Sequence, residues 1–405
     1  MKILSRLSDF YYRLDRKKLW IIWTANILWI VLLFSYIWCL DSYAATWEDN
    51  IPTLSPLDCK SAVLMEAETG RILYEQNADE SLPPASVTKV MTLLLTMEAI
   101  EKGNITLDQM LTASDHAASM GGTQVFLEVG EQMSVEDLLK SVIIASANDA
   151  AVVLAEAIAG SEESFVSMMN NRASELGMQN THFENTNGLD DTVTDHVTSA
   201  RDISLMSREL IRHEKILEYS SIWMDTVRNG EFGLTNTNRL VRFYKGATGL
   251  KTGSTSKAKF CISATAKRDG MHLIAVIMGA PTRDIRNAEA TKLLDWGFAN
   301  YSLYKYDPCS LGEVKLLGSN TSMLECKTDG ISLLVPKGTS GKITSEINLP
   351  ESVKAPLSAG EQVGNIVFKL DGEEIGKAKI VSSRDANPIS FAELFFIMLQ
   401  KFILW

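Results

Sequence analysis

The chain is 405 residues long, which allows two or three domains, because a domain of ordinary size has ~100–200 residues. Apolar residues make up 46% of the sequence and charged residues 22%, so a buried core can form and wholesale disorder is excluded. The net charge of −11 argues against a protein that binds the phosphate backbone of DNA or RNA, so no nucleic-acid partner is expected.

The first 44 residues differ from the rest in charge and hydropathy. They carry six Lys and Arg side chains against three Asp side chains, whereas the remainder is strongly acidic. An apolar run at residues 19–40 follows the basic cluster 16–18, and the small residues Ser42 and Ala44 suit a signal-peptidase site. The run of 22 residues is also long enough to span a bilayer. Residues 1–44 are thus a signal peptide cleaved after Ala44, which we favour, or an uncleaved anchor; both place the body outside the cytoplasm.

Residues 45–305 predict one domain with strands at its two ends and helices between them. Apolar runs on either side of Glu-Thr-Gly at 68–70 predict a β-hairpin. Helical patterns follow at 86–102, 135–144, 147–159, 161–176 and 196–213. Two further strands are expected at 260–267 and 272–279, and then a helix at 287–298. The expected class is α/β (α+β), with one antiparallel sheet built from both ends of the segment.

After residue 306 the sequence changes to short alternating runs. Turn signals such as Asp-Gly at 329–330 and 371–372 separate them and predict a small all-β domain at 306–383. Cys309 and Cys326 lie in this stretch, where they could pair in an oxidising compartment. Buried free thiols are an equal alternative for these two and for Cys59 and Cys261. No Cys-x-x-Cys occurs, so no zinc or thioredoxin-type site is expected.

The last segment, residues 388–405, predicts an amphipathic helix that begins near Pro388 and Ser390. Its large apolar residues recur at helical spacing: Phe391, Leu394, Phe395, Met398, Phe402 and Trp405. Sixteen residues from Ser390 are too few to cross a bilayer. Either the helix packs on its own protein or it lies in the membrane interface, and we favour the interface because apolar residues extend round much of its circumference.

Three short motifs carry the chemistry. The first is Ser-Val-Thr-Lys at 86–89, where Lys89 lies one helical turn after Ser86 on the same face. A neutral lysine held against a serine can take its proton and make it a nucleophile. Taken alone, the motif occurs often by chance and is better explained by a helix cap at Ser86 and a solvated first-turn lysine at Lys89.

The second motif, Ser146-Ala-Asn148, places a hydroxyl and an amide within an apolar stretch, where each needs a partner. They suit either a helix junction or a proton relay with a clamp for a substrate amide. The third motif, Lys251-Thr-Gly with Ser254 after it, falls on a predicted strand. A glycine there lets an extended substrate approach the strand, and Lys251 supplies positive charge.

In this order, with 60 and then 105 residues between the motif starts, the sequence resembles the penicillin-recognising serine acyltransferases. More narrowly it resembles the low-molecular-mass penicillin-binding proteins that are serine-type D-alanyl-D-alanine carboxypeptidases. Further phrases of that family occur at 84–86, 182–189, 237–240 and 278–280. The resemblance implies a penicillin-binding-protein/β-lactamase-like transpeptidase fold with an antiparallel sheet and a helical subdomain. A small all-β domain and a terminal amphipathic helix on the membrane surface complete it.

The resemblance also implies roles for individual residues. Ser86 would attack a peptidoglycan stem peptide ending in D-Ala-D-Ala, or a β-lactam, to form an acyl-enzyme. Lys89 would be the general base, Ser146 a proton relay and Asn148 the clamp on the substrate amide. The groups facing the terminal carboxylate would be Lys251, Thr252 and Arg286, with Arg283 a weaker candidate, and the oxyanion would be bound by the N–H groups of Ser86 and Ser254, beside Gly253.

This assignment carries a physical condition. Lys89 must be largely neutral near pH 7, although a free lysine has a pKa of about 10.4. We expect burial and the neighbouring Lys251 cation to lower its pKa.

Three other functions fit the sequence less well. A class A-like β-lactamase would use a Glu to activate water, and Glu184 has a superficially suitable position. The sequence has no Gly-x-Ser-x-Gly motif, which argues against a Ser-His-Asp hydrolase. A binding protein with an inactive site is disfavoured because all three motifs are intact. No phosphate-binding loop or metal-ligand spacing occurs, so no cofactor is expected. The expected location is the extracytoplasmic face of the bacterial cytoplasmic membrane.

Overall fold

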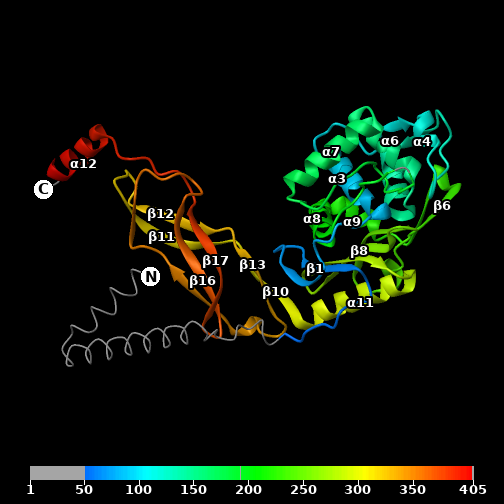
Figure 1. Cartoon of the computed structure of the whole chain (residues 1–405). Coiled ribbons are helices and arrows are strands. Elements are labelled where there is room, and N and C mark those ends of the chain that lie inside the picture. The colour runs from blue at the N-terminus through cyan, green and yellow to red at the C-terminus, as the bar shows by residue number, and fades with distance from the viewer. Residues whose placement is uncertain (1–50, 192, 404–405) are drawn as a thin grey trace, which may run out of the picture. The chain divides into compact units, whose positions relative to one another are not determined.

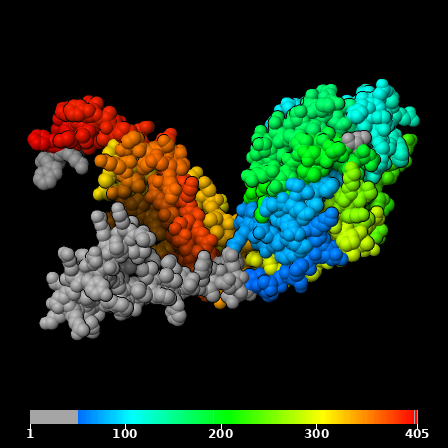
Figure 2. All heavy atoms as spheres, viewed as in Figure 1, coloured from blue at the N-terminus to red at the C-terminus, as the bar shows by residue number. Residues whose placement is uncertain are grey.

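The structure is a computed structural model that describes residues 51–191 and 193–403. The predicted signal segment at 1–44 and the terminal Trp405 lie outside the described residues. Within the described residues, no helix combines the length and the apolar character that crossing a membrane requires. The elements of residues 53–300 pack into one continuous body, as the blue-to-yellow spheres of Figure 2 show.

A five-stranded antiparallel sheet forms the centre of this body. Its order is β2-β1-β9-β8-β7, which joins strands from both ends of the segment as expected. The strands are β1 (Ser61–Glu66), β2 (Ile72–Gln76), β7 (Ala247–Thr255), β8 (Lys259–Arg268) and β9 (Met271–Ala280). Because β7 is the last strand in the order, one of its sides has no partner strand and is open to an extended peptide.

Helices cover both faces of this sheet. On one face lies α11 (Arg283–Asn300), and on the other lie α8 (Ala200–Leu210) and α3 (Lys89–Glu101), as Figure 1 shows. β1 is buried along its whole length because it is sandwiched between these layers. The remaining helices of the body are α4 (Asp115–Ala118), α5 (Val135–Lys140), α6 (Asn148–Ala159), α7 (Glu162–Glu175), α9 (Glu214–Ser220) and α10 (Leu240–Phe243).

Three predicted helices differ in detail from those observed. The one expected at 86–102 starts as a 3₁₀ turn, η2 (Ala85–Thr88), before α3. The one expected at 135–144 ends in a π turn, η3 (Ser141–Ala145), because Ser146 turns the chain out of the helix. The one expected at 196–213 begins only at Ala200, since Ser199 caps α8 and the residues before it pair as isolated β-bridges.

Two short hairpins complete this body: β3 (Met110–Thr112) with β4 (Gln132–Ser134), and β5 (Met224–Val227) with β6 (Phe232–Thr235). A 3₁₀ turn, η4 (Arg228–Gly230), joins the second pair.

The later part of the chain is all-β, as its alternating pattern predicts. A six-stranded sheet has the order β14-β16-β17-β12-β11-β15, and β10 pairs with β13. The strands are β10 (Tyr301–Tyr306), β11 (Cys309–Leu317), β12 (Met323–Thr328), β13 (Ile331–Pro336), β14 (Ile343–Asn348), β15 (Ser352–Lys354), β16 (Gln362–Leu370) and β17 (Glu373–Ser382), with a 3₁₀ turn η5 (Ser340–Lys342). The buried side chains of Leu324, Phe368 and Ile380 belong to its core.

The four cysteines of the described residues are free thiols. Cys261 and Cys326 are buried, Cys59 is half-buried and Cys309 is exposed. Of the two alternatives for Cys309 and Cys326, the structure has the unpaired one.

The last element is α12 (Phe391–Ile403). It begins where the sequence predicts, because Ser390 and Glu393 cap each other's backbone N–H groups at 3.3 and 2.8 Å. Nine of its apolar side chains are between 38% and 86% exposed.

Candidate active site

Ser86 lies on the 3₁₀ turn η2, directly before the buried helix α3. The preceding residue, Ala85, has a φ of 49°, in the left-handed region that residues other than glycine rarely adopt. The turn therefore places Ser86 at the N-terminal end of α3, where its Oγ lies 3.0 Å from Lys89 Nζ.

The amine of Lys89 lies among three oxygen atoms. Its side chain is fully buried, and Nζ lies 3.0 Å from Ser86 Oγ, 2.6 Å from Asn148 Oδ1 and 2.8 Å from the carbonyl oxygen of Asn187. Burial and then the charge of Lys251 lower the pKa of Lys89 well below its ordinary value, as expected. A neutral amine has two N–H donors and one lone pair. With the donors directed to Asn148 and Asn187, the lone pair faces the Ser86 hydroxyl and can accept its proton.

Ser146 and Asn148 lie where a helix is interrupted. The π turn η3 ends at Ser146, which has a φ of 72° in the left-handed region. Its hydroxyl oxygen accepts a hydrogen bond of 2.8 Å from Lys251 Nζ. Asn148 begins α6, and its Nδ2 donates to the Gly121 carbonyl at 2.7 Å, which turns its Oδ1 toward Lys89. The interruption thus turns both side chains toward the two lysines.

The third motif lies on β7, at the open edge of the sheet. Lys251 is fully buried and donates to Ser146 Oγ and to the Thr252 carbonyl oxygen at 2.9 Å. Burial, followed by repulsion from Arg286, lowers the pKa of Lys251 to about 7. The Thr252 hydroxyl donates to Thr237 Oγ1 at 2.8 Å.

Gly253 is where β7 passes closest to the turn that carries the serine. A Cβ at this position would lie 2.7 Å from the Pro84 carbonyl oxygen, 2.8 Å from Ser86 N and 2.9 Å from Val87 N. These are backbone atoms, which cannot move aside as a flexible side chain can. The glycine therefore brings the edge strand and the Ser86 N–H together, with Ser254 next to them.

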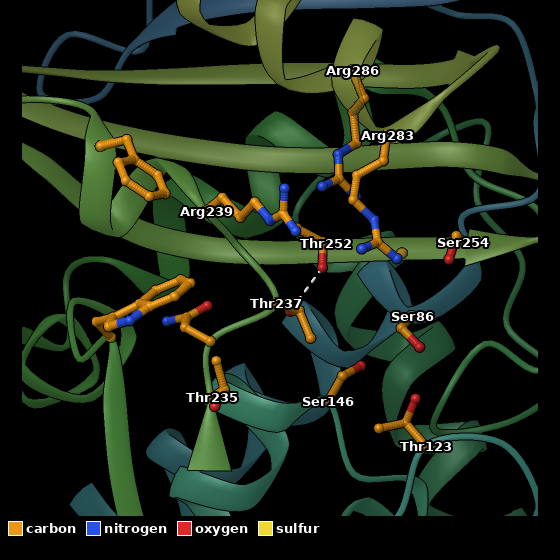
Figure 3. A pocket seen from close by; sticks show the side chains of 14 residues that line it. Ser86, Thr123, Ser146, Thr235, Thr237, Arg239, Thr252, Ser254, Arg283 and Arg286 are labelled. Carbon is orange, nitrogen blue, oxygen red and sulfur yellow. Dashed lines mark hydrogen bonds between the residues drawn. The ribbon is translucent and has the colours of Figure 1, made fainter.

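Of these groups, Ser86, Ser146, Thr252, Gly253 and Ser254 line one cleft of about 670 Å³, whereas Lys89, Asn148 and Lys251 are buried and are not among its lining residues. In Figure 3, Ser86, Ser146 and Thr252 face this space from three different elements, and Arg286 and Arg283 reach toward it from α11. Among the described residues, the lining of the cleft contains three arginines and no carboxylate. The lining residues are Ser86, Thr123, Ser146, Trp223, Thr235, Asn236, Thr237, Arg239, Phe243, Thr252, Gly253, Ser254, Arg283 and Arg286. The cleft is therefore suited to an anionic ligand.

Arg286 is the buried member of the arginine set. It is 3% exposed, and its Nε and Nη2 donate to Asn287 Oδ1 at 3.1 and 2.9 Å. Burial and then the charge of Arg283 lower its pKa to about 10. No carboxylate of the described chain forms an ion pair with it, so its charge is available to a ligand.

Several residues of the site were not among those predicted. Asn187 contacts Lys89 through its backbone carbonyl, which has no signature in a sequence, although the residue falls in the family phrase at 182–189. Arg239 lies in the phrase 237–240 in the same way. Nothing in the sequence marks the cleft-lining residues Trp223 and Phe243, whose ring centroids are 6.3 Å apart.

The residues of the alternative functions lie elsewhere. Glu184 does not line the cleft; its Oε2 accepts from the backbone N–H groups of Thr194 and Asp195 at 2.9 Å each. The hydrogen bond from Asp195, followed by that from Thr194, lowers the pKa of Glu184, and both hold its carboxylate against the backbone of its own loop. None of the five histidines lines the cleft, and among residues 51–191 and 193–403 no group of three His, Cys, Asp or Glu side chains could hold a metal ion.

The sequence is similar to two known protein families. The sequence matches the family described as D-alanyl-D-alanine carboxypeptidase over residues 48–282 and that described as penicillin-binding protein 5, C-terminal domain, over residues 304–387. D-alanyl-D-alanine carboxypeptidase DacF of Bacillus subtilis (strain 168) is 43% identical over 342 residues, covering 82% of this chain and 87% of that protein.

Solved structures also match. Penicillin-binding protein 5 from Haemophilus influenzae has a TM-score of 0.74 at 32% identity, covering 83% of this chain and 99% of that one. Penicillin-binding protein D2 from Listeria monocytogenes in its ampicillin-bound form has a TM-score of 0.56 at 34% identity, covering 61% and 100%. The expected mixed fold, with an all-β module after it, is confirmed.

Proposed function

This chain belongs to the D-alanyl-D-alanine carboxypeptidase family, and from that premise we propose that it removes the terminal D-Ala from peptidoglycan stem peptides through an acyl-enzyme on Ser86. The observation that carries the proposal is the placement of Lys89. Its buried amine, with a lowered pKa, lies 3.0 Å from Ser86 Oγ and has two other oxygens to receive its N–H groups.

Acylation begins when Ser86 gives its hydroxyl proton to Lys89 and its Oγ bonds to the carbonyl carbon of the penultimate D-Ala. The carbonyl oxygen becomes an oxyanion, which the backbone N–H groups of Ser86 and Ser254 stabilise. The C–N bond then breaks. Ser146 gives its proton to the leaving amine and takes one from Lys251, whose Nζ lies 2.8 Å away. The proton held by Lys89 replaces the one that Lys251 has lost.

Hydrolysis completes the cycle. A water molecule adds to the ester carbonyl and gives a proton to Lys89, the bond to Oγ breaks, and Lys89 returns that proton to Ser86. The acid product leaves with the free carboxylate, and both lysines regain their starting charges.

The peptide is held along the open edge of β7. The Asn148 side chain faces the substrate amide, while Lys251, Thr252 and Arg286 face the terminal carboxylate. Among residues 51–191 and 193–403, no acidic side chain lines the cleft, which supports this assignment because a carboxylate ligand meets no repulsion from the lining. β-Lactams, whose carboxylate and strained amide imitate the peptide terminus, acylate the same serine.

A labelled penicillin tests the assignment directly. The label is expected on the peptide that contains Ser86, and Ser86→Ala is expected to abolish it. Slow release of the bound penicillin together with release of D-Ala from a stem pentapeptide supports the carboxypeptidase. Penicillin turnover at tens per second would instead indicate a β-lactamase, which the position of Glu184 outside the cleft disfavours.

The chain acts at the extracytoplasmic face of the bacterial membrane, with α12 as its contact to the lipid surface. The exposed apolar side chains of this helix support the assignment over a helix buried on its own protein. Removing residues 388–405 is expected to release the protein from lipid vesicles and to leave its activity on soluble peptides intact. Equal vesicle binding with and without this segment would refute the role of the helix.

A further inference from the structure

A line of hydrogen bonds ends at the peptide unit before the nucleophile. Thr88 Oγ1 donates to the Ala85 carbonyl oxygen at 2.8 Å, and His196 Nε2 lies 2.7 Å from the same Oγ1. His196 Nδ1 lies 3.0 Å from the backbone nitrogen of Glu184, which donates to it. Thr88 is fully buried and His196 is 6% exposed, so water does not compete for these bonds.

The direction of each bond follows from one fixed donor. A backbone N–H can only donate, so His196 Nδ1 must accept, and the proton of the neutral ring is on Nε2. Nε2 therefore donates to Thr88 Oγ1, and the Thr88 hydroxyl proton is directed to the Ala85 carbonyl. Burial favours the neutral ring by lowering the pKa of His196 to about 4. All the donors point toward the Ala85–Ser86 peptide.

The Ala85 carbonyl and the Ser86 N–H belong to the same planar, trans peptide unit, so they point in opposite directions. Fixing the carbonyl therefore fixes the N–H. The carbonyl is confined on a second side by Gly188, where a Cβ would lie 1.9 Å from the Ala85 oxygen. The left-handed φ of Ala85 makes this restraint necessary, because an alanine does not hold that conformation by preference.

We propose that His196 and Thr88 are positioning residues that orient the Ser86 N–H toward the oxyanion and strengthen it as a donor. A hydrogen bond to a peptide carbonyl polarises the N–H of the same unit, so the chain from Glu184 to Ser86 acts in one direction. The inference rests on the proposed function, in which this N–H binds the oxyanion.

Two substitutions at Thr88 test it. Thr88→Ser keeps the hydroxyl, whereas Thr88→Val keeps the shape and removes it. Loss of one oxyanion donor costs ~10²–10³ in rate, so a misdirected donor is expected to lower the acylation rate constant for penicillin ~10–100-fold in Thr88→Val. The apparent dissociation constant of the penicillin should change little. Thr88→Ser should stay within ~3-fold of the parent protein on the same scale.

Two substitutions at His196 divide its hydrogen bonds. His196→Gln keeps an N–H at the position of Nε2, and His196→Asn keeps only an acceptor at the position of Nδ1. The glutamine variant is expected to acylate faster than the asparagine variant, although both lose the ring. A residue that merely supports the fold would respond alike to both, in step with the thermal unfolding temperature.

Two spectroscopic readouts complete the test, and the first needs no variant, so it stays decisive if a variant does not fold. In the unsubstituted protein, the ¹⁵N resonances of His196 should show a proton on Nε2 and none on Nδ1; the opposite tautomer overturns the inference. In the acyl-enzyme, the infrared band of the ester carbonyl should move to higher frequency in Thr88→Val and not in Thr88→Ser. Identical bands also overturn it. Failure of the parent protein to bind penicillin covalently would instead refute the proposed function itself.

Discussion

A carboxylate that enters the cleft is expected to draw a proton onto Lys251. The amine is fully buried, and burial followed by Arg286 lowers its pKa to about 7. The free protein at pH 8 therefore holds Lys251 largely neutral. A carboxylate beside the Lys251 amine raises its pKa, because an opposite charge nearby favours the ionised form.

The size of the effect follows from the charges. At pH 8 a group of pKa 7 is protonated in about one molecule in ten. A carboxylate ~4 Å away contributes about 4 kcal/mol at an effective dielectric constant near 20, which corresponds to ~3 pKa units. Lys251 is then almost fully protonated in the complex. Binding should take up about 0.9 proton at pH 8 and about 0.1 proton at pH 6.

The uptake is measurable with a pH indicator in weakly buffered solution. Ser86→Ala prevents turnover while a peptide ending in D-Ala-D-Ala is added to saturation, and the same peptide with a terminal carboxamide is the matched control. Lys251→Gln should abolish the uptake. If the carboxylate peptide binds at pH 8 without taking up protons, or if the carboxamide takes up as many, Lys251 does not titrate as its burial predicts.

Three further outcomes are expected. Gly253→Ala should abolish acylation of Ser86, because the new Cβ would meet backbone atoms at 2.7–2.9 Å, whereas Gly341→Ala, which has open space, should be silent in the same penicillin-binding assay. Burial lowers the pKa of His272 to about 4, below that of an unfolded histidine, so the folded state binds fewer protons between about pH 4 and pH 6.5. The free energy of unfolding measured with urea should thus fall by about 2 kcal/mol from pH 7 to pH 5 through this group, and His272→Gln should remove that part. Lys89→Arg should abolish acylation at every pH up to 10, since a guanidinium keeps its proton; a basic limb of recovered activity would contradict the role of a neutral amine.

The contact between Ser86 and Lys89 could be predicted because it is local: three residues along a helix bring two side chains to one face. The convergence of Ser146 with Lys251 spans 105 residues and could be expected only from the resemblance to a family. Secondary structure was predicted well where periodicity was strong, as in β8 and β9, and least well at the turns beside the site. Those turns depend on left-handed residues and on tertiary contacts that a local pattern does not contain.

Backbone atoms account for much of what the sequence could not reveal. The Asn187 carbonyl supplies one of the three oxygens around the Lys89 amine. Backbone atoms of Pro84, Ser86 and Val87 leave no room for a side chain at position 253. Any residue type supplies such atoms, so no motif marks them. The lowered pKa of Lys89 was nevertheless predictable, because it needs only burial and a neighbouring cation, and both follow from the motifs.

The two buried lysines are coupled in a way that favours a substrate with a free terminus. Lys89 works as a base only when neutral, and its pKa is lowered in part by the charge of Lys251. Lys251 is itself only partly charged near pH 7 until an anion enters the cleft. A bound carboxylate restores the positive charge of Lys251, and this charge disfavours a proton on Lys89. The negative charge of the carboxylate itself partly offsets that effect. Because Lys251 is fully buried, its charge is screened by water less than that of a carboxylate in the open cleft, so we expect the effect of Lys251 to dominate. A peptide with a blocked terminus then loses both its anchor and part of the preparation of the base, so selectivity for the free carboxylate should appear in the acylation rate as well as in binding.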